Sequence, residues 1–191
     1  MRMAASERRS QLVRVAVATF ARQGFYGTSM NDIADAAGVT KPVLYQHFRS
    51  KRSLYKELLS ELGAELRDSI AKVTSNAAGP REQISLGIEA YFAWVAQHED
   101  AFKVLFGDST RRDPEFADAA RRVERSMAEL VAEHIDIPSL NWEHRLLLGN
   151  GIVGMVEAAC RSWLEHEVDV DASELAAQVS RLAWAGLRGA G

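Results

Sequence analysis

Residues 28–51 read TSMNDIADAAGVTKPVLYQHFRSK, and this stretch decides the fold. The pattern predicts a short helix, a tight turn at 37–39 and a second short helix. Gly38 suits the turn because glycine adopts the left-handed backbone conformation without a β-carbon clash. Ala34 and Ala37 are small enough for two helices to cross closely. The stretch therefore predicts a helix-turn-helix, a motif whose second helix enters the major groove of DNA.

The second helix of this motif is predicted to have an apolar inner side and an unusual outer side. Leu44 and Phe48 occupy the inner side. A DNA groove would suit the outer side, because glutamine pairs with adenine and apolar groups contact thymine methyls. The outer residues expected at the groove are Pro42, Val43 and Gln46, and those expected at the DNA backbone are Tyr45, His47, Arg49 and Lys51. Lys41, at the start of the helix, could reach a base edge or a phosphate.

Other polar side chains near this motif admit two interpretations. Arg8, Arg9 and Arg14 could contact phosphates or could simply face solvent. Asn31 could read a base, or it could only cap the helix in which it lies. The sequence does not decide between these alternatives.

Helical patterns with identifiable stops also cover the rest of the chain, and strict apolar–polar alternation typical of strands is absent. Residues 76–80 form the plainest break. Strong signals for the start of a helix are Asp113 followed by Pro114, and Asp171 at the start of the last helix. Ser139 is expected to cap the start of the second-to-last helix. The expected fold class is all-α, with nine helices at about 6–23, 29–37, 40–50, 50–75, 81–97, 100–106, 113–135, 139–167 and 171–187.

Charge is distributed unevenly along the chain. Residues 1–55 carry nine Lys or Arg and three acidic residues, a balance of +6. The other 136 residues therefore hold −9, since the whole chain has a formal net charge of −3. This division indicates a phosphate-binding end attached to a body that does not bind phosphate.

Motifs of enzymes and metal sites are missing from the sequence. The single cysteine, Cys160, excludes an internal disulfide and a site of several thiolates. The five histidines form no HExxH pattern, and nucleophile-elbow, P-loop and dinucleotide-binding patterns are absent. We therefore expect no catalytic residues, no metal and no cofactor.

Targeting segments are also missing. The first residues lack the apolar run of a signal peptide, and no apolar stretch is long enough to span a bilayer. The expectation is a cytoplasmic protein without a membrane partner.

Short motifs in the first part of the chain carry a family resemblance. These motifs are Gly24-Phe25, Thr28-Ser29-Met30, Asp32-Ile33-Ala34, Ala37-Gly38-Val39, Lys41-Pro42, Leu44-Tyr45, His47-Phe48 and Ser50-Lys51. With them, from about residue 8 to 60, the chain resembles the TetR family of bacterial helix-turn-helix regulators.

The resemblance implies two domains with different functions. Residues 1–53 would form a three-helix DNA-binding domain, and residues 54–191 a helical domain for ligand binding and dimerisation. In that family, DNA contacts are made at the positions held here by Ser29, Asn31, Lys41, Pro42, Tyr45, His47 and Lys51.

The resemblance also implies a homodimer, in which the last two long helices, at about 140–166 and 172–187, pair with their copies. Apolar residues that include Leu146, Ile152 and Val153 give the first of them a broad apolar surface. The alternative is that this surface is buried within one subunit. Dimerisation also suits the function, because one short recognition helix reads too few bases to be specific.

A small-molecule effector would bind among the helices between residues 81 and 165, in a cavity with apolar walls. Glu157 and Arg161, four residues apart, are more simply an internal ion pair than ligand contacts. The aromatic and Met content favours a hydrophobic or amphipathic effector, such as a lipid, an acyl thioester or a drug. The expected ligand-binding residues are Tyr91, Trp94, Phe102, Phe106, Met127, Met155 and Trp163.

The sequence thus predicts a regulator bound to double-stranded operator DNA, which the resemblance suggests is a repressor that its ligand releases. The rival hypothesis is a helical interaction protein that binds ligand but has lost operator binding. Salt distinguishes the two, because true operator binding weakens steeply as the salt concentration rises.

Overall fold

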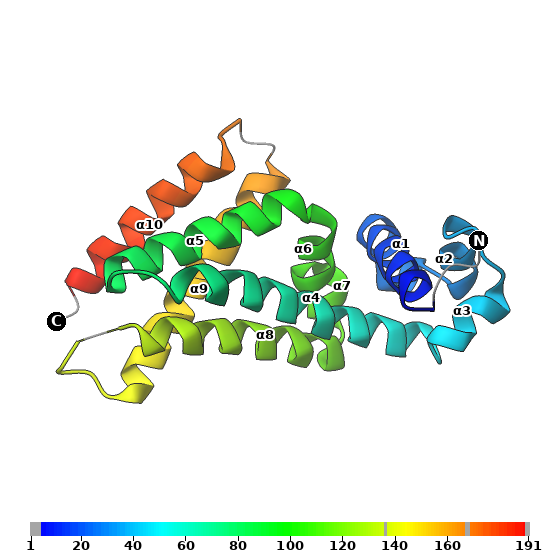
Figure 1. The fold of residues 1–191 in the computed structure, drawn as a ribbon, viewed down its shortest axis with the longest axis horizontal. Helices are drawn as coiled ribbons and strands as arrows, with labels where there is room; N and C mark the ends of the chain where they lie inside the picture. Colours follow the sequence, from blue (N-terminus) through cyan, green and yellow to red (C-terminus); the bar gives the residue numbers. More distant parts are fainter. Residues whose placement is uncertain (1–4, 136, 167–168, 190–191) are drawn as a thin grey trace. The chain divides into compact units, whose positions relative to one another are not determined.

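The computed structural model describes residues 5–135, 137–166 and 169–189 of the 191-residue chain. Within these ranges all regular secondary structure is helical (Figure 1). The helices are α1 (Ala5–Gly27), α2 (Met30–Ala36), α3 (Lys41–His47), α4 (Lys51–Thr74), α5 (Pro80–Gln97), α6 (Glu99–Phe106), α7 (Asp108–Arg112), α8 (Pro114–Glu133), α9 (Trp142–Glu165) and α10 (Ala172–Arg188).

The predicted all-α fold class is confirmed, and each of the nine predicted helices has its counterpart. The additional element is α7, a single turn of five residues directly after Gly107. So short a helix has no periodicity of its own, and its sequence DSTRR carries no apolar stripe. The predicted end of α9 near Glu167 lies outside the described residues.

Helix starts were predicted well where a carboxylate precedes the helix. Asp113 Oδ1 accepts from the amide of Glu115 at 3.1 Å, and α8 begins at Pro114. Asp171 Oδ1 accepts from the amide of Ser173 at 2.8 Å and caps α10. The predicted cap of α9 at Ser139 is wrong, because Asn141 accepts from the amide of His144 instead.

The chain divides into two compact units, which are described separately. The first comprises the described residues up to Gly63 together with His98–Ala120. In it α1 packs against α2, α6 and α7, and α2 packs against α3. Its centre is aromatic: the ring of Tyr55 lies 4.9 Å from that of Phe20, 5.1 Å from that of Phe25 and 4.6 Å from that of Phe116.

The second unit comprises 64–97 and the described part of 121–191. In it α5 packs along α10 and also contacts α9 (Figure 1). Gly149 of α9 lies so close to α8 that a β-carbon there would approach the carbonyl oxygen of Ala128 to 2.5 Å. Both α4 and α8 have residues in each of the two units, because the divisions fall after Gly63 and after Ala120.

Gly24 interrupts α1 and shapes the first unit. Its backbone has φ +70° and ψ 168°, a combination that is almost confined to glycine. The next amide, that of Phe25, donates to Ser109 Oγ at 3.0 Å. A β-carbon on Gly24 would lie 2.9 Å from the same oxygen, so a larger residue would displace the Ser109 side chain in addition to straining the backbone.

Candidate nucleic-acid interface and ligand cavity

The first helix of the predicted motif begins with a reciprocal cap. Ser29 Oγ accepts from the amide of Asp32 at 3.2 Å, and Asp32 Oδ2 accepts from the amide of Ser29 at 2.7 Å. The backbone amide and the side chain of Ser29 both hydrogen-bond the Asp32 carboxylate and lower the pKa of Asp32, because these bonds favour its ionised form. Ser29 therefore caps α2 with its side chain, and Asp32 caps the backbone of Ser29 in return.

The turn between α2 and α3 has the predicted form. Gly38 has φ +64°, and the amide of Val39 donates to the carbonyl oxygen of Ala34 at 3.0 Å. Thr40 caps α3 with its backbone in an extended conformation, and Pro42 lies in the first turn. The helix-turn-helix geometry of residues 28–51 is thus present.

The two sides of α3 are also divided as predicted. Leu44 and Phe48 are buried, with 0% and 1% exposure. Phe48 already has an extended backbone, so α3 ends before it, but its side chain still faces the core. The exposed residues on the other side are Lys41, Pro42, Tyr45 and Gln46, with Val43 and His47 half-buried.

Lys41 and Tyr45 form a pair on the exposed side of α3. The ammonium of Lys41 lies 6.0 Å from the centre of the Tyr45 ring, within the range of a cation–π interaction. Asn31 is exposed at the start of α2. DNA contact by these residues, and by the others of the expected set, stays a prediction.

Lys51 lies at the start of α4 and bonds to the main chain of the first unit. Its Nζ donates to the carbonyl oxygens of Phe25 and Thr28, each at 2.7 Å, and lies 4.3 Å from the centre of the Phe25 ring. Partial burial lowers its pKa, although Asp32 opposes this effect. Two of its three N–H donors therefore bind the main chain at the end of α1 and directly after it, and the third takes no part in these two bonds.

Two other basic side chains, both from α1, also bind partners within the first unit. Arg9 pairs with Glu57 at 3.1 Å and with Glu61, and its guanidinium lies 5.5 Å from the centre of the Phe48 ring. Arg8 donates to Gln11 at 2.7 Å. Of the three N-terminal arginines whose role the sequence left open, these two thus have protein partners.

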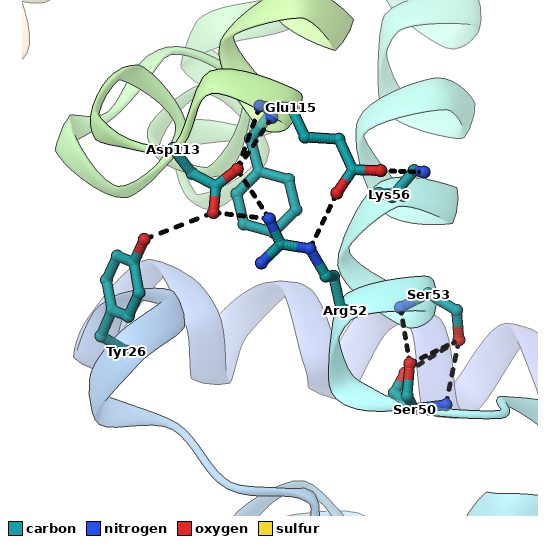
Figure 2. Close-up of polar contacts among 8 residues, drawn as sticks. Tyr26, Ser50, Arg52, Ser53, Lys56, Asp113 and Glu115 are labelled. Carbon is teal, nitrogen blue, oxygen red and sulfur yellow. Dashed lines mark hydrogen bonds and ion pairs between the residues drawn. The ribbon is translucent and has the colours of Figure 1, made fainter.

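Arg52 is the centre of an ion-pair network, which Figure 2 shows. It donates to both carboxylate oxygens of Asp113, at 2.9 and 2.8 Å, and to Glu115 at 2.7 Å. Glu115 also pairs with Lys56, and the Tyr26 hydroxyl donates to Asp113 at 3.4 Å. Desolvation would raise the pKa of Asp113, but the bonds from Arg52 and from the α8 amides lower it on balance. The network ties the first two turns of α4 to the start of α8.

The second unit contains a cavity of about 60 Å³, lined by residues of α4, α5, α8 and α9. Tyr91 and Met127 of the seven expected ligand-binding residues line it. The walls that sequence reasoning missed are mostly aliphatic, and they include Ile70, Ile84, Ile88, Leu130, Val131, Ile152, Val153 and Val156. In sequence these residues look like ordinary core, so only the packing of the four helices identifies them.

The other five expected residues do not line this cavity. Phe102 and Phe106 belong to α6 in the first unit, where their rings lie 5.3 Å apart. Trp163 packs against Phe92 at 6.3 Å and donates to the carbonyl oxygen of Val170. Trp94 is buried in α5, and Met155 is half-buried in α9.

Polar groups around the cavity are few. The Tyr91 hydroxyl is buried, and within the described part of the chain it has no hydrogen-bond partner. Burial raises the pKa of Tyr91, and Cys160, Glu157 and Glu124 raise it further. Glu157 and Arg161 form the predicted ion pair. Burial also raises the pKa of Cys160, which keeps this thiol neutral.

The outer faces of α9 and α10 carry exposed apolar residues. Leu147 is 68% exposed and Leu182 is 63% exposed. The exposed residues Leu147, Gly151, Gly154 and Ala158 recur at helical spacing along α9. Ile152 and Val153 of the expected dimer surface are instead buried within the protomer, as the alternative interpretation required. Among the described helices, none is long and apolar enough to cross a membrane.

Family models match both parts of the chain. One, described as "Bacterial regulatory proteins, tetR family", matches residues 12–58. Another, described as "Tetracyclin repressor-like, C-terminal domain", matches residues 80–186, which is more than half of the chain.

Two relatives illustrate the range of regulators to which the chain is similar. The transcriptional activator FasR of Mycolicibacterium smegmatis is 28% identical over 187 residues, which cover 97% of this chain and 85% of that protein. The transcriptional repressor KstR2 of the same species is 31% identical over 107 residues, which cover 56% of this chain and 52% of that protein.

Two solved structures share the fold. A TetR-like regulator from Rhodococcus sp. RHA1 matches with a TM-score of 0.82 at 26% identity, covering 98% of this chain and all of that one. FadR of Bacillus subtilis, solved in complex with stearoyl-CoA, matches with a TM-score of 0.77 at 19% identity, covering 92% and 97%.

The different contacts of two lysines in the motif lead to a prediction about stability. Replacing Lys51 by Met leaves the carbonyl oxygens of Phe25 and Thr28 without their charged donor, so we expect the free energy of unfolding to fall by about 1–3 kcal/mol. Lys41→Met is the matched control, because Lys41 is exposed and should change stability by less than about 0.5 kcal/mol. Urea unfolding followed by circular dichroism measures both, and equal destabilisation would contradict the assigned role of Lys51.

Proposed function

The chain belongs to the TetR family of bacterial regulatory proteins, and we propose that it is a dimeric repressor that a hydrophobic or amphipathic ligand releases from its operator. It is a DNA-binding transcriptional regulator and not an enzyme. Because its binding site would lie on chromosomal DNA, the protein is proposed to act in the cytoplasm.

The exposed face of α3 is the observation that supports operator recognition most strongly. Gln46 and Tyr45 project from a helix whose opposite side is anchored by Leu44, and Lys41 stands at its start. Glutamine reads adenine through two hydrogen bonds, whereas tyrosine and lysine suit phosphate oxygens. This division assigns base reading to Pro42, Val43 and Gln46, and positioning on the backbone to Ser29, Lys41, Tyr45, His47 and the remaining donor of Lys51.

The sense of regulation is proposed to be repression. The similar proteins include both a repressor, KstR2, and an activator, FasR. The direction depends on where the operator lies relative to the promoter, so it is a property of the DNA as well as of the protein.

Two helices could carry a signal from the cavity to the DNA-binding unit. Ile70 of α4 and Met127 of α8 line the cavity, and the N-terminal ends of the same helices are tied together in the first unit by Arg52 and Asp113. A ligand that separates the two helices at the cavity would thereby strain or shift the start of α4, which is connected to α3. Release requires the ligand to bind this shifted state more tightly than the operator-bound state.

The ligand class is proposed from the apolar walls of the cavity, and it agrees with the similarity to FadR, whose structure contains stearoyl-CoA. The cavity of about 60 Å³ is well below the usual size of ligand sites, roughly 300–1,000 Å³. A ligand of that size must therefore widen it, which is how binding would favour a different arrangement of helices.

Dimerisation is proposed through the exposed faces of α9 and α10. Isolated exposed leucines are ordinary, but Leu147 continues into Gly151 and Gly154, at which an added β-carbon would meet nothing within 4 Å. Small residues along one face let a second helix approach closely. A two-fold dimer would present two α3 helices to successive major grooves, about one helical turn apart.

Operator binding can be tested with DNA recovered by selection from random double-stranded oligonucleotides. We expect Tyr45→Ala to weaken binding by about tenfold or more, and Lys41→Met to weaken it and lower the slope of log K against log salt by about one. Lys72→Met is the control, because it removes the same charge from an exposed position of α4 in the second unit. If selection enriches no sequence and association is insensitive to salt, the rival interaction protein is the correct interpretation.

The dimer can be tested by light scattering after size-exclusion chromatography at micromolar concentration. The wild type should have twice the 21.1 kDa mass of one chain, and Leu147→Glu with Leu182→Glu should reduce it to 21.1 kDa, because two charges would be buried at the interface. Val73→Glu, at an exposed apolar position of α4, should leave the mass unchanged. A wild type of 21.1 kDa, or a double variant that keeps the doubled mass, would refute this interface.

A further inference from the structure

Tyr91 lines the apolar cavity of the second unit and carries a buried hydroxyl. Its side chain is 3% exposed, lines the cavity from α5, and its hydroxyl has no hydrogen-bond partner in the described part of the chain. Buried hydroxyls are almost always hydrogen-bonded, because leaving one unpaired is costly. The orphan hydroxyl is therefore an unusual feature at a place where a ligand is expected.

The other polar side chains at the cavity have partners or lie apart from Tyr91. Thr74 Oγ1 donates to the carbonyl oxygen of Ile70, and His134 Nδ1 lies 2.6 Å from that of Leu130. Gln83 is eight residues before Tyr91 on α5, about 12 Å away along the helix axis. Among the lining residues, Tyr91 thus carries a buried polar atom that has no partner in the described part of the chain.

The charges near Tyr91 favour an uncharged partner. The cavity has no lysine or arginine in its lining. The carboxylates of Glu157 and Glu124 act on the phenol and, together with its burial, raise its pKa, so it stays protonated and can donate. A ligand carboxylate at the same place would lose its water, and the lining offers no cation to pair with it, since the nearby Arg161 is already paired with Glu157.

We propose that Tyr91 selects the effector by donating a hydrogen bond to an uncharged carbonyl oxygen on an aliphatic chain, as in an ester or a thioester, and that it discriminates against the free carboxylate. The aliphatic walls, which include Ile88, Ile152 and Val156, would hold the chain. This inference rests on the proposed function, which takes the cavity as the effector site.

A matched pair of probes tests the inference, namely methyl octanoate and octanoate, which differ mainly in the charge of one end. By isothermal titration calorimetry at pH 8, the wild type should bind the ester at least tenfold more tightly than the carboxylate. Tyr91→Phe should weaken ester binding by about tenfold, because the hydrogen bond to the carbonyl is lost. The same variant should keep or raise the midpoint of thermal unfolding, because it removes an unpaired buried hydroxyl.

Tyr26→Phe is the control, since it removes a phenolic hydroxyl from the first unit and should bind both probes as the wild type does. No binding of the ester to the wild type, equal binding of the carboxylate, or an unchanged ester affinity in Tyr91→Phe would overturn the inference. Operator binding of the same samples without probe reports on the proposed function separately. Release of the operator by octanoate but not by its ester would overturn only the role of Tyr91.

Discussion

The burial of Leu44 and Phe48 is the constraint on which the DNA-binding part of the structure depends. α3 has seven residues, and a helix of that length is not stable by itself in water. Packing of these two side chains therefore holds the helix and also fixes which face it exposes. The guanidinium of Arg9 lies against the Phe48 ring, and Lys51 holds the carbonyl groups that precede α2. The exposed face of α3 is consequently set by interactions beneath it and beside it.

The positive charge of the first 55 residues has two uses. Arg9, Lys51 and Arg52 neutralise carboxylates or bind main-chain oxygens within the first unit. Lys41 and Arg49 are exposed around α3 and remain suited to phosphates. The basic balance of the sequence coincides with the part of the chain that contains the helix-turn-helix, but it overstates the charge that is available to phosphates, because internal ion pairs cannot be recognised from composition.

Local chemistry explains which parts of the fold could be predicted. Gly38, Asp113 and Asp171 act on their own neighbours, through a left-handed turn or a cap, so their effects are visible in a few consecutive residues. Asn141 was missed as a cap because Ser139, two residues earlier, is an equally acceptable residue for that role. Contacts between distant segments, such as Lys51 with Phe25, leave no periodic pattern.

The lining of the ligand cavity was still harder to predict from the sequence. Large aromatic residues were expected to line it, yet most of the walls are Ile, Leu and Val, which are common in any helical core. Tyr91 and Met127 were predicted because they are large and apolar, but the unpaired hydroxyl of Tyr91 is a property of the packed structure alone.

Methylation protection by dimethyl sulfate tests the proposed docking of α3 most directly, because the reagent modifies N7 of guanine in the major groove and N3 of adenine in the minor groove. Bound to its selected operator, the protein should protect guanine N7 in two patches about one helical turn apart, one for each α3 of the dimer. Tight binding with protection confined to adenine N3 would contradict recognition of the major groove by α3.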